Sequence, residues 1–239
     1  MLEPRNCLLV DIGNTRTKYV FADNHNQLTD LSYINKKEDI PSLLSHCSRV
    51  VLASVNNEAA FLSWQSESEK RGVPLTRVKT QAEAFGIRCP YQTPAKLGVD
   101  RWLCALAVAK RTTKAVAIID VGTAATCDFV FNGEYLGGWI APGFDLMRLS
   151  LVQNTANVSA DDVFPETIEI GEDTEACVNG GCLAMLSGFI VEAEKKIAAL
   201  SSNYELVLTG GGAQMLAEIS PEYAKVEDNL LFKGLALFS

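Results

Sequence analysis

Positive charge is scarce in this sequence. Its 239 residues include 21 Lys and Arg against 29 Asp and Glu, a net charge of −8, and its pI is about 4.9. A protein that binds a nucleic-acid backbone or an anionic membrane needs a positive surface. We therefore expect neither nucleic acid nor membrane as a partner, whereas a small nucleotide site with local donors and a metal ion stays open.

Long hydrophobic runs are also missing. The longest apolar run lies near residues 103–109, which is far shorter than the ~20 residues that cross a bilayer. The opening residues MLEPRN carry both charge signs, and the apolar run after them is too short for a secretory signal. We expect a cytoplasmic protein.

Metal-binding cysteine and histidine patterns are absent too. The seven cysteines are scattered without a C-x-x-C pair, and the two histidines, His25 and His46, lie far from any cysteine pair. A zinc site is therefore not expected. Buried free thiols in a reducing compartment account for the cysteines.

What is present is an alternation of short apolar strands with helices. We expect strands at residues 7–11, 18–22, 28–34, 50–55, 115–120, 126–131, 134–140 and 205–208. Helices are expected at residues 38–45, 58–70, 98–110, 174–200 and 229–238, with another after residue 143 and a loop at residues 86–96.

The strand pattern occurs twice. The stretches CLLVDIGNTRTKYVFADN and AIIDVGTAATCDFVFNG both run from an apolar strand ending in Asp, through a glycine turn, to a second strand, so Asp11 corresponds to Asp120 and Gly13 to Gly122. This predicts an α/β fold with an internal duplication of a β-β-β-α-β-α unit. We place the two domains at residues 1–114 and 115–239.

Each copy carries groups suited to phosphate. In DIGNT, Gly13 permits close approach of a ligand to the backbone, and Asn14, Thr15 and Thr17 add donors. A carboxylate cannot face a phosphate directly, so a metal ion or water would lie between Asp11 and the ligand. A turn with capping polar residues is the better explanation of one copy alone, but its repetition in register at Asp120 favours a phosphate site.

Three further motifs stand out. TGGGA, at residues 209–213, follows a strand and opens a helix, so a base or ribose can lie against its backbone. LGVDRW, at residues 97–102, places Asp100 and Arg101 in the first turn of an apolar helix, where a helix-stabilising carboxylate is the simpler interpretation. GGWIAPG, at residues 137–143, reads as a tight chain corner unless it belongs to a site.

The three glycine motifs in this order resemble the superfamily of acetate and sugar kinases, heat-shock chaperones and actin. This resemblance implies two ribonuclease-H-like domains with the active site in the cleft between them. The set DIGNT, LGVDRW, DVGTAAT, GGWIAPG and TGGGA closely resembles type III pantothenate kinase over almost the whole chain. The resemblance implies ATP-dependent phosphorylation of pantothenate to 4'-phosphopantothenate, the first step of coenzyme A biosynthesis, by a homodimer.

The same resemblance assigns roles to residues. It implies that ATP is bound by Asp11, Ile12, Gly13, Asn14, Thr15, Arg16, Thr17, Lys18, Thr123, Gly210, Gly211 and Gly212. It implies that pantothenate is bound by Tyr91, Gly98, Val99, Asp100, Arg101 and Thr174, with Asp100 as the catalytic base. Asp120 would be the ligand of a monovalent cation, K⁺ or NH₄⁺, and Asp11 would hold Mg²⁺ through water.

Other functions remain open from the sequence alone. Another small-molecule kinase of the superfamily would share the glycine loops but not GVDR. Some relatives of the family are accessory regulators of transcription, although all the carboxylates expected of an enzyme are present here. An α/β binding protein without chemistry is disfavoured by the duplicated aspartate loops.

Overall fold

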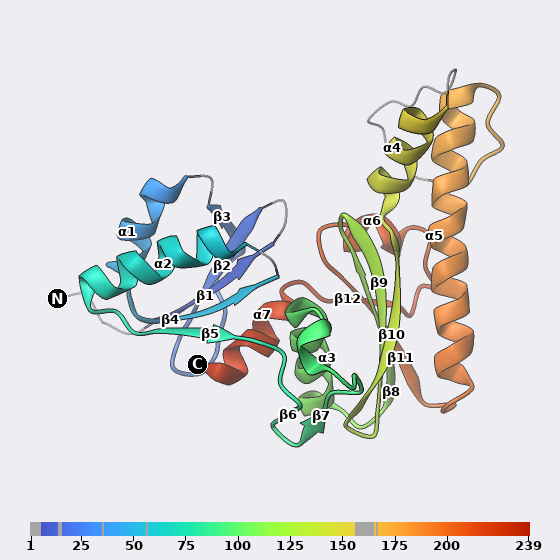
Figure 1. Ribbon diagram of the computed structural model, residues 1–239. Coiled ribbons are helices and arrows are strands. Elements are labelled where there is room, and N and C mark those ends of the chain that lie inside the picture. The colour runs from blue at the N-terminus through green and yellow to red at the C-terminus, as the bar shows by residue number, and fades with distance from the viewer. Residues whose placement is uncertain (1–5, 14–15, 35, 56, 156–164, 166) are drawn as a thin grey trace. The chain divides into compact units, whose positions relative to one another are not determined.

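The computed structural model describes residues 6–13, 16–34, 36–55, 57–155, 165 and 167–239 (Figure 1). The chain divides into two compact units. The first comprises Met1–Ala107 together with Asn229–Ser239, and the second comprises Val108–Asp228. Each unit is built around its own mixed sheet, so each is described by itself.

The first unit contains a five-stranded sheet in the order β3-β2-β1-β4-β5. Its strands are β1 (Asn6–Ile12), β2 (Thr17–Ala22), β3 (Ser32–Ile34), β4 (Cys47–Ser54) and β5 (Leu75–Val78). β1, β2 and β3 form an antiparallel meander, whereas β4 and β5 continue from β1 in parallel. The parallel strands therefore end at one edge of the sheet, which is where ligands bind in many open α/β sheets.

Helices cover both faces of this sheet. Helices α1 (Ile40–Leu44) and α2 (Glu58–Arg71), after the short η1 (Lys37–Asp39), cover the face that carries Leu8, Val10 and Leu52. Helices α3 (Val99–Arg111) and α7 (Leu230–Leu235), with η3 (Ala236–Phe238), cover the opposite face, which carries Leu9 and Val51. A hairpin of β6 (Glu83–Ala84) and β7 (Ile87–Arg88) and the turn η2 (Pro94–Lys96) precede α3.

The second unit repeats this plan with a sheet in the order β10-β9-β8-β11-β12. Its strands are β8 (Ala115–Val121), β9 (Ala124–Phe131), β10 (Glu134–Pro142), β11 (Tyr204–Thr209) and β12 (Lys225–Val226), and its helices are α4 (Phe144–Asn154), α5 (Thr174–Ala198) and α6 (Ala213–Ala217). β8, β9 and β10 are antiparallel neighbours, and β11 and β12 continue in parallel from β8. The expected duplication and the α/β class are confirmed.

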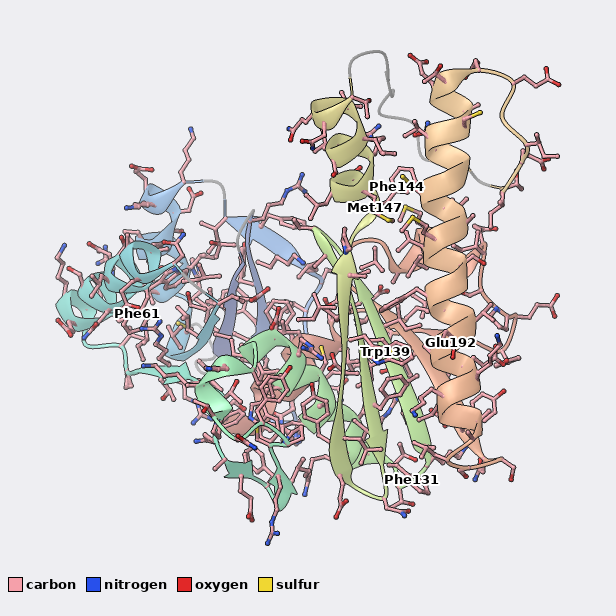
Figure 2. All side chains as sticks on the ribbon, turned by 45° about the vertical axis from the view of Figure 1, so that its right-hand side comes forward. Phe61, Phe131, Trp139, Phe144, Met147 and Glu192 are labelled. Carbon is pink, nitrogen blue, oxygen red and sulfur yellow. The ribbon has the colours of Figure 1, made fainter. Side chains whose placement is uncertain are left out.

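Helix α5 provides much of the core of the second unit. Its buried residues, including Leu183, Leu186 and Ile190, pack against the apolar face of β8, β9 and β11. Figure 2 shows Phe144 and Met147 pointing from α4 toward α5, and both side chains belong to this core. By length and composition α5 is the one described helix that could cross a membrane. The expectation that no apolar segment is long enough to cross a bilayer is therefore wrong. Its packing against the sheet accounts for its apolar composition.

Some elements differ from the expected ones. The segment at residues 86–96, expected as a loop, contains β7 and η2, and the short strands β5, β6 and β12 were not expected. The C-terminal segment Asn229–Ser239 packs on the first unit. There the backbone of Leu103 in α3 occupies the space that a side chain at Gly234 would need.

Candidate active site

The first aspartate loop, residues 11–18, begins at the carboxyl end of β1. Asp11 is 7% exposed, and it faces Lys18 of β2 across the antiparallel pair. Strand alternation places the Asp11 side chain on the face covered by α3 and α7, together with Leu9. The Gly13 N–H donates to the Arg16 carbonyl at 3.1 Å, which closes the turn.

Six of the eight residues expected in this loop are described. Ile12 is buried, whereas Gly13, Thr17 and Lys18 are half-buried and Arg16 is exposed. The Arg16 guanidinium lies 5.7 Å from the centre of the Tyr33 ring on β3. Asn14 and Thr15 lie outside the described residues, so their expected contacts with ATP stay predictions.

The GVDR motif reaches the same edge of the same sheet. The hydroxyl of Thr80, two residues beyond β5, donates to the Leu97 carbonyl at 2.8 Å. Val99 is buried in the cluster that contains Ala53, the residue of β4 that pairs with Asp11. The first turn of α3 therefore lies beyond the carboxyl ends of the parallel strands, on the face that Asp11 occupies.

Within this turn, the side chains of Asp100 and Arg101 are fixed in different ways. The Arg101 N–H donates to Oδ1 of Asp100 at 2.9 Å, so the carboxylate lies at the helix N-terminus, where negative charge is favoured. The Arg101 side chain is buried, and its Nη1 donates to the Tyr91 hydroxyl at 3.2 Å. The structure thus brings together three residues expected to bind the acceptor.

The second aspartate loop, residues 120–126, lies at the carboxyl end of β8 in the second unit. Asp120 pairs with Thr126 of β9 on one side and with Thr209 of β11 on the other. Thr123 is exposed at the tip of the loop. The Thr123 carbonyl accepts a hydrogen bond from the Gly143 N–H at 3.0 Å.

Gly143, the last residue of the GGWIAPG motif, contributes to this loop. A Cβ at this position would overlap the Gly122 carbonyl oxygen and lie 2.8 Å from the Thr123 carbonyl oxygen. Only glycine therefore allows the end of β10 to approach the loop this closely. The sequence signal was the Pro142-Gly143 pair directly after a strand.

The glycine loop, residues 209–213, lies against the second aspartate loop. The Gly212 N–H donates to the Val121 carbonyl at 2.9 Å. Gly210 has φ +85°, and a Cβ there would overlap Oδ1 of Asp120. Because residues with a side chain rarely adopt this φ, Gly210 suits both the turn and the carboxylate beside it. The second unit thus assembles Asp120, Thr123 and the glycine loop at one edge of its sheet.

Thr174 is not part of that group. It is exposed in the first turn of α5, where the Asp173 carboxylate caps the helix by accepting from the Ala176 N–H at 2.8 Å. Figure 1 shows this end of α5 beside α4, beyond the edge of the sheet of the second unit. Its expected contact with the acceptor stays a prediction.

The residues fit the cations that the resemblance implies. Carboxylate and carbonyl oxygens are the ligands that hard cations prefer. Asp11 offers a nearly buried carboxylate, and Oδ1 of Asp120 and the Val121 carbonyl oxygen both lie next to Gly210. In the described part of the chain, no group of three or more His, Cys, Asp or Glu forms a metal cluster.

The fold and these loops define the class of protein: a two-domain α/β protein of the actin-like ATPase and sugar kinase fold. A ROK family glucokinase from Streptomyces griseus, solved with glucose and AMPPNP, has a similar fold, with a TM-score of 0.52, 10% identity and coverage of 98% of this chain and 99% of its own. A conserved protein from Campylobacter jejuni, described as a Baf family transcriptional activator, has a TM-score of 0.59, 22% identity and coverage of 96% of each chain.

The sequence comparisons are more specific. The family model of type III pantothenate kinase matches residues 7–196. A type III pantothenate kinase from Pseudoalteromonas atlantica is 40% identical over 240 residues, which is 98% of each chain. This chain belongs to the type III pantothenate kinase family.

Proposed function

We propose that this protein transfers the γ-phosphoryl group of ATP to the primary hydroxyl of pantothenate, giving 4'-phosphopantothenate for coenzyme A synthesis. The observation that carries this proposal is the position of GVDR in the first unit. In a chain of this family, Asp100 and Arg101 lie at the carboxyl edge of the sheet whose first strand, β1, carries Asp11 as its last residue but one. An acceptor-activating group and a phosphate loop therefore belong to one edge of one sheet.

The two aspartate loops are assigned to the phosphates of ATP, and the glycine loop is assigned to its adenosine. Phosphoryl transfer has a loose transition state, so positioning and charge neutralisation dominate its catalysis. Lys18, which faces Asp11 across the antiparallel pair, supplies positive charge, and Thr17 and Thr123 supply hydroxyl donors in the same two loops. The backbone of Gly210, Gly211 and Gly212 offers an adenosine a surface without side chains.

Asp100 acts as the general base in this proposal. It accepts a hydrogen bond from the attacking hydroxyl, orients it and takes its proton late in the transfer, and such help contributes about 10²–10⁴-fold. Arg101 donates to the Tyr91 hydroxyl, and in this proposal its positive charge pairs either with the carboxylate of pantothenate or with the transferring phosphoryl group. Both roles are electrostatic and require the guanidinium to stay charged.

Two kinds of cation are part of the proposal. Mg²⁺ would neutralise the ATP phosphates and would be held through water by Asp11. A monovalent cation, K⁺ or NH₄⁺, would be held by Asp120 and would add positive charge at the second aspartate loop. The support is the oxygen chemistry of both loops and the family membership of the chain.

We also propose that the protein is a cytoplasmic homodimer. All seven cysteines are free, which suits a reducing compartment. Large apolar side chains are exposed on α4, on α5 and on the segment before α5: Leu146, Leu149, Ile168, Ile170 and Met185, of which Ile170 is 94% exposed. Such a patch is typical of a protein–protein interface. Met185→Glu should convert the dimer to a monomer in sedimentation experiments, and an unchanged sedimentation coefficient would count against this surface.

The deciding experiment measures ADP release by the purified protein with ATP and Mg²⁺, with and without pantothenate, in potassium and in sodium buffers. We expect pantothenate-dependent turnover that needs K⁺ or NH₄⁺. Equal rates in the two buffers would contradict the proposed need for a monovalent cation. The absence of pantothenate-dependent turnover would contradict the proposed reaction. Parallel assays with N-acetyl sugars test another small-molecule kinase.

Asp100→Asn tests the assigned base. The substitution keeps the size of the side chain, so we expect folding and ATP binding to persist while kcat falls at least about 10²-fold. Near-native kcat would remove Asp100 from this role. A role in transcription is carried by no feature of the described residues, since the likeness to the Campylobacter jejuni protein shows the fold alone.

A further inference from the structure

Gly98 lies immediately before α3 and stands against the carboxylate of Asp100. A Cβ built on Gly98 would overlap Oδ1 of Asp100 and would lie 3.6 Å from its Cγ, and apart from the two adjacent residues no other atom of the described residues lies within 4 Å. The φ angle of Gly98 is not in the left-handed region. The backbone therefore accepts any residue here, and the space needed for the Asp100 carboxylate is what excludes a side chain.

Other glycines of the site are constrained differently. A Cβ at Gly143 is blocked by backbone atoms, and Gly210 has a positive φ in addition to its contact with Asp120. A substitution at either position would disturb the backbone as well as a side chain. At Gly98 the only atoms displaced belong to the end of one side chain, so the effect of a substitution can be assigned to Asp100.

The position of this carboxylate has a consequence for its two oxygens. Oδ1 is held by the Arg101 N–H at 2.9 Å, and within the described part of the chain Oδ2 makes no hydrogen bond. One oxygen thus fixes the side chain to the start of α3, while the other remains for a ligand. With a Cβ at position 98, the carboxylate would have to rotate away from the Arg101 N–H.

We propose that Gly98 is a positioning residue: its missing side chain lets Asp100 fold back onto the helix N-terminus, with Oδ1 fixed and Oδ2 directed at the acceptor hydroxyl. This inference rests on the proposed function for the identity of the acceptor. It gives Gly98 a steric role that acts through Asp100 and needs no contact between Gly98 and the substrate.

The kinetic test uses Gly98→Ala. Because a displacement of about 1 Å in a positioned group can cost about 10²-fold, we expect kcat to fall about 10–100-fold while KM for ATP stays within about twofold. In the Asp100→Asn background, Gly98→Ala should cause no further loss, because residues that act as a unit are not additive. Wild-type kcat in Gly98→Ala, or an equal loss in both backgrounds, would overturn the proposal.

Gly98→Ser separates the steric effect from helix capping. The Gly98 carbonyl accepts from the Trp102 N–H at 3.1 Å, so Gly98 is the N-cap of α3. Serine caps helices better than alanine does, but it carries the same Cβ. Loss of kcat in both variants supports the proposal, whereas a serine variant with wild-type kcat overturns it. Gly188→Ala, at a glycine of α5 with open space around it, is the matched control for an added methyl group.

A readout independent of turnover is hydrogen exchange of the Arg101 amide. In Gly98→Ala this amide loses its carboxylate acceptor, so it should exchange up to about tenfold faster, at the rate found in Asp100→Ala. Unchanged exchange would overturn the proposal. If the wild-type protein did not phosphorylate pantothenate, the proposed function would fail, while this measurement would still decide whether Gly98 sets the position of the carboxylate.

Discussion

The two aspartate loops of this protein begin at equivalent positions of two separate sheets, but their surroundings differ. Asp11 is the last residue but one of β1 and pairs with Ala53 of β4, and Asp120 is the last residue but one of β8 and pairs with Thr209 of β11. Across the antiparallel pair, however, Asp11 faces Lys18, whereas Asp120 faces Thr126. Duplication has kept the carboxylate in both units, and the residue that faces it across the antiparallel pair is a lysine in the first unit and a threonine in the second.

The loops also differ in length. Four residues, 13–16, separate β1 from β2, whereas only Gly122 and Thr123 separate β8 from β9. The longer loop has more backbone N–H groups that can turn toward a phosphate. The shorter loop is packed against Gly143 and the glycine loop. The first loop is therefore the better candidate for phosphate contact, and the second for a cation held close to the backbone.

The segments after the partner strands, β4 and β11, differ as well. The Val55 N–H donates to the Ile12 carbonyl at 3.3 Å after β4, and the Gly212 N–H donates to the Val121 carbonyl at 2.9 Å after β11. In the first unit the chain then enters α2 through Asn57, whose side chain accepts from the Ala60 N–H at 3.0 Å. In the second unit the chain passes through three glycines. Equivalent backbone positions thus carry a helix cap in one unit and a side-chain-free surface in the other.

The largest expected effect comes from replacing the carboxylate of an aspartate loop with a neutral amide. Asp11→Asn should lower kcat/KM about 10–100-fold, which is the usual loss when a group that organises a metal through its water is removed. Raising the KCl concentration should not restore this activity. Steady-state ADP release at several Mg²⁺ and K⁺ concentrations measures both effects.

Asp120→Asn is the matched variant. In its proposed role Asp120 is a direct ligand of the monovalent cation, and the substitution would weaken it. The activity of this variant should therefore rise toward wild type as KCl is raised, because mass action compensates for weaker binding. The same response to KCl in both variants would mean that the two loops do not differ in the way proposed.

Gly210→Ala should lower the free energy of unfolding by about 1–3 kcal/mol, because it forces a residue with a Cβ into a left-handed conformation. The added Cβ would also overlap Oδ1 of Asp120. Gly211→Ala, where a Cβ meets no atom within 4 Å, should change stability by less than about 0.5 kcal/mol. Urea unfolding of the two variants measures the difference, and equal stabilities would show that the left-handed conformation at position 210 does not require glycine.

Local sequence pattern was sufficient for much of this comparison. The strands ending in Asp11 and Asp120 were predicted because an apolar run, a carboxylate and a glycine are adjacent in sequence, and the duplication was visible for the same reason. The two-residue strands β6, β7 and β12 are too short to carry a period. The packing of Asn229–Ser239 on the first unit, and the contacts of Gly98 and Gly143, depend on residues distant in sequence or on atomic space, so no local pattern reports them.

One ionisable group in each unit, Cys47 in the first and Glu205 in the second, should make stability depend on pH. Burial raises the pKa of the Cys47 thiol in β4 from 9.0 to about 11, and the neighbouring Cys7 thiol adds to the rise. A pKa raised on folding gives stability that is present below pH 9.0 and is lost as the pH rises toward 11. We expect a loss of about 1–2 kcal/mol, reduced for partial exposure. Urea unfolding under reducing conditions should show a shallower alkaline loss in Cys47→Ala, and identical pH profiles would contradict this origin.

The smallest expected effect concerns Glu205 in β11. Its counterpart in the first unit is Arg49, since Glu205 lies four residues before Thr209, which pairs with Asp120, and Arg49 lies four residues before Ala53, which pairs with Asp11. Burial raises the pKa of Glu205, but the hydrogen bonds from Lys114 at 3.1 Å and from Lys225 outweigh it and hold the pKa below 4.5. A lowered pKa gives stability that is present above pH 4.5 and is lost as the pH falls through the folded value.

Since ion pairs at a surface contribute less than about 1 kcal/mol, Glu205→Gln should flatten the acid side of the stability profile only slightly. Glu192→Gln is the matched control, because Glu192 pairs with Lys195 at 3.5 Å while 64% of its side chain is exposed. Thermal unfolding between about pH 3 and 6 compares the variants. If Glu192→Gln flattened the profile as much as Glu205→Gln, the lysines around Glu205 would not be the cause of the acid-dependent stability.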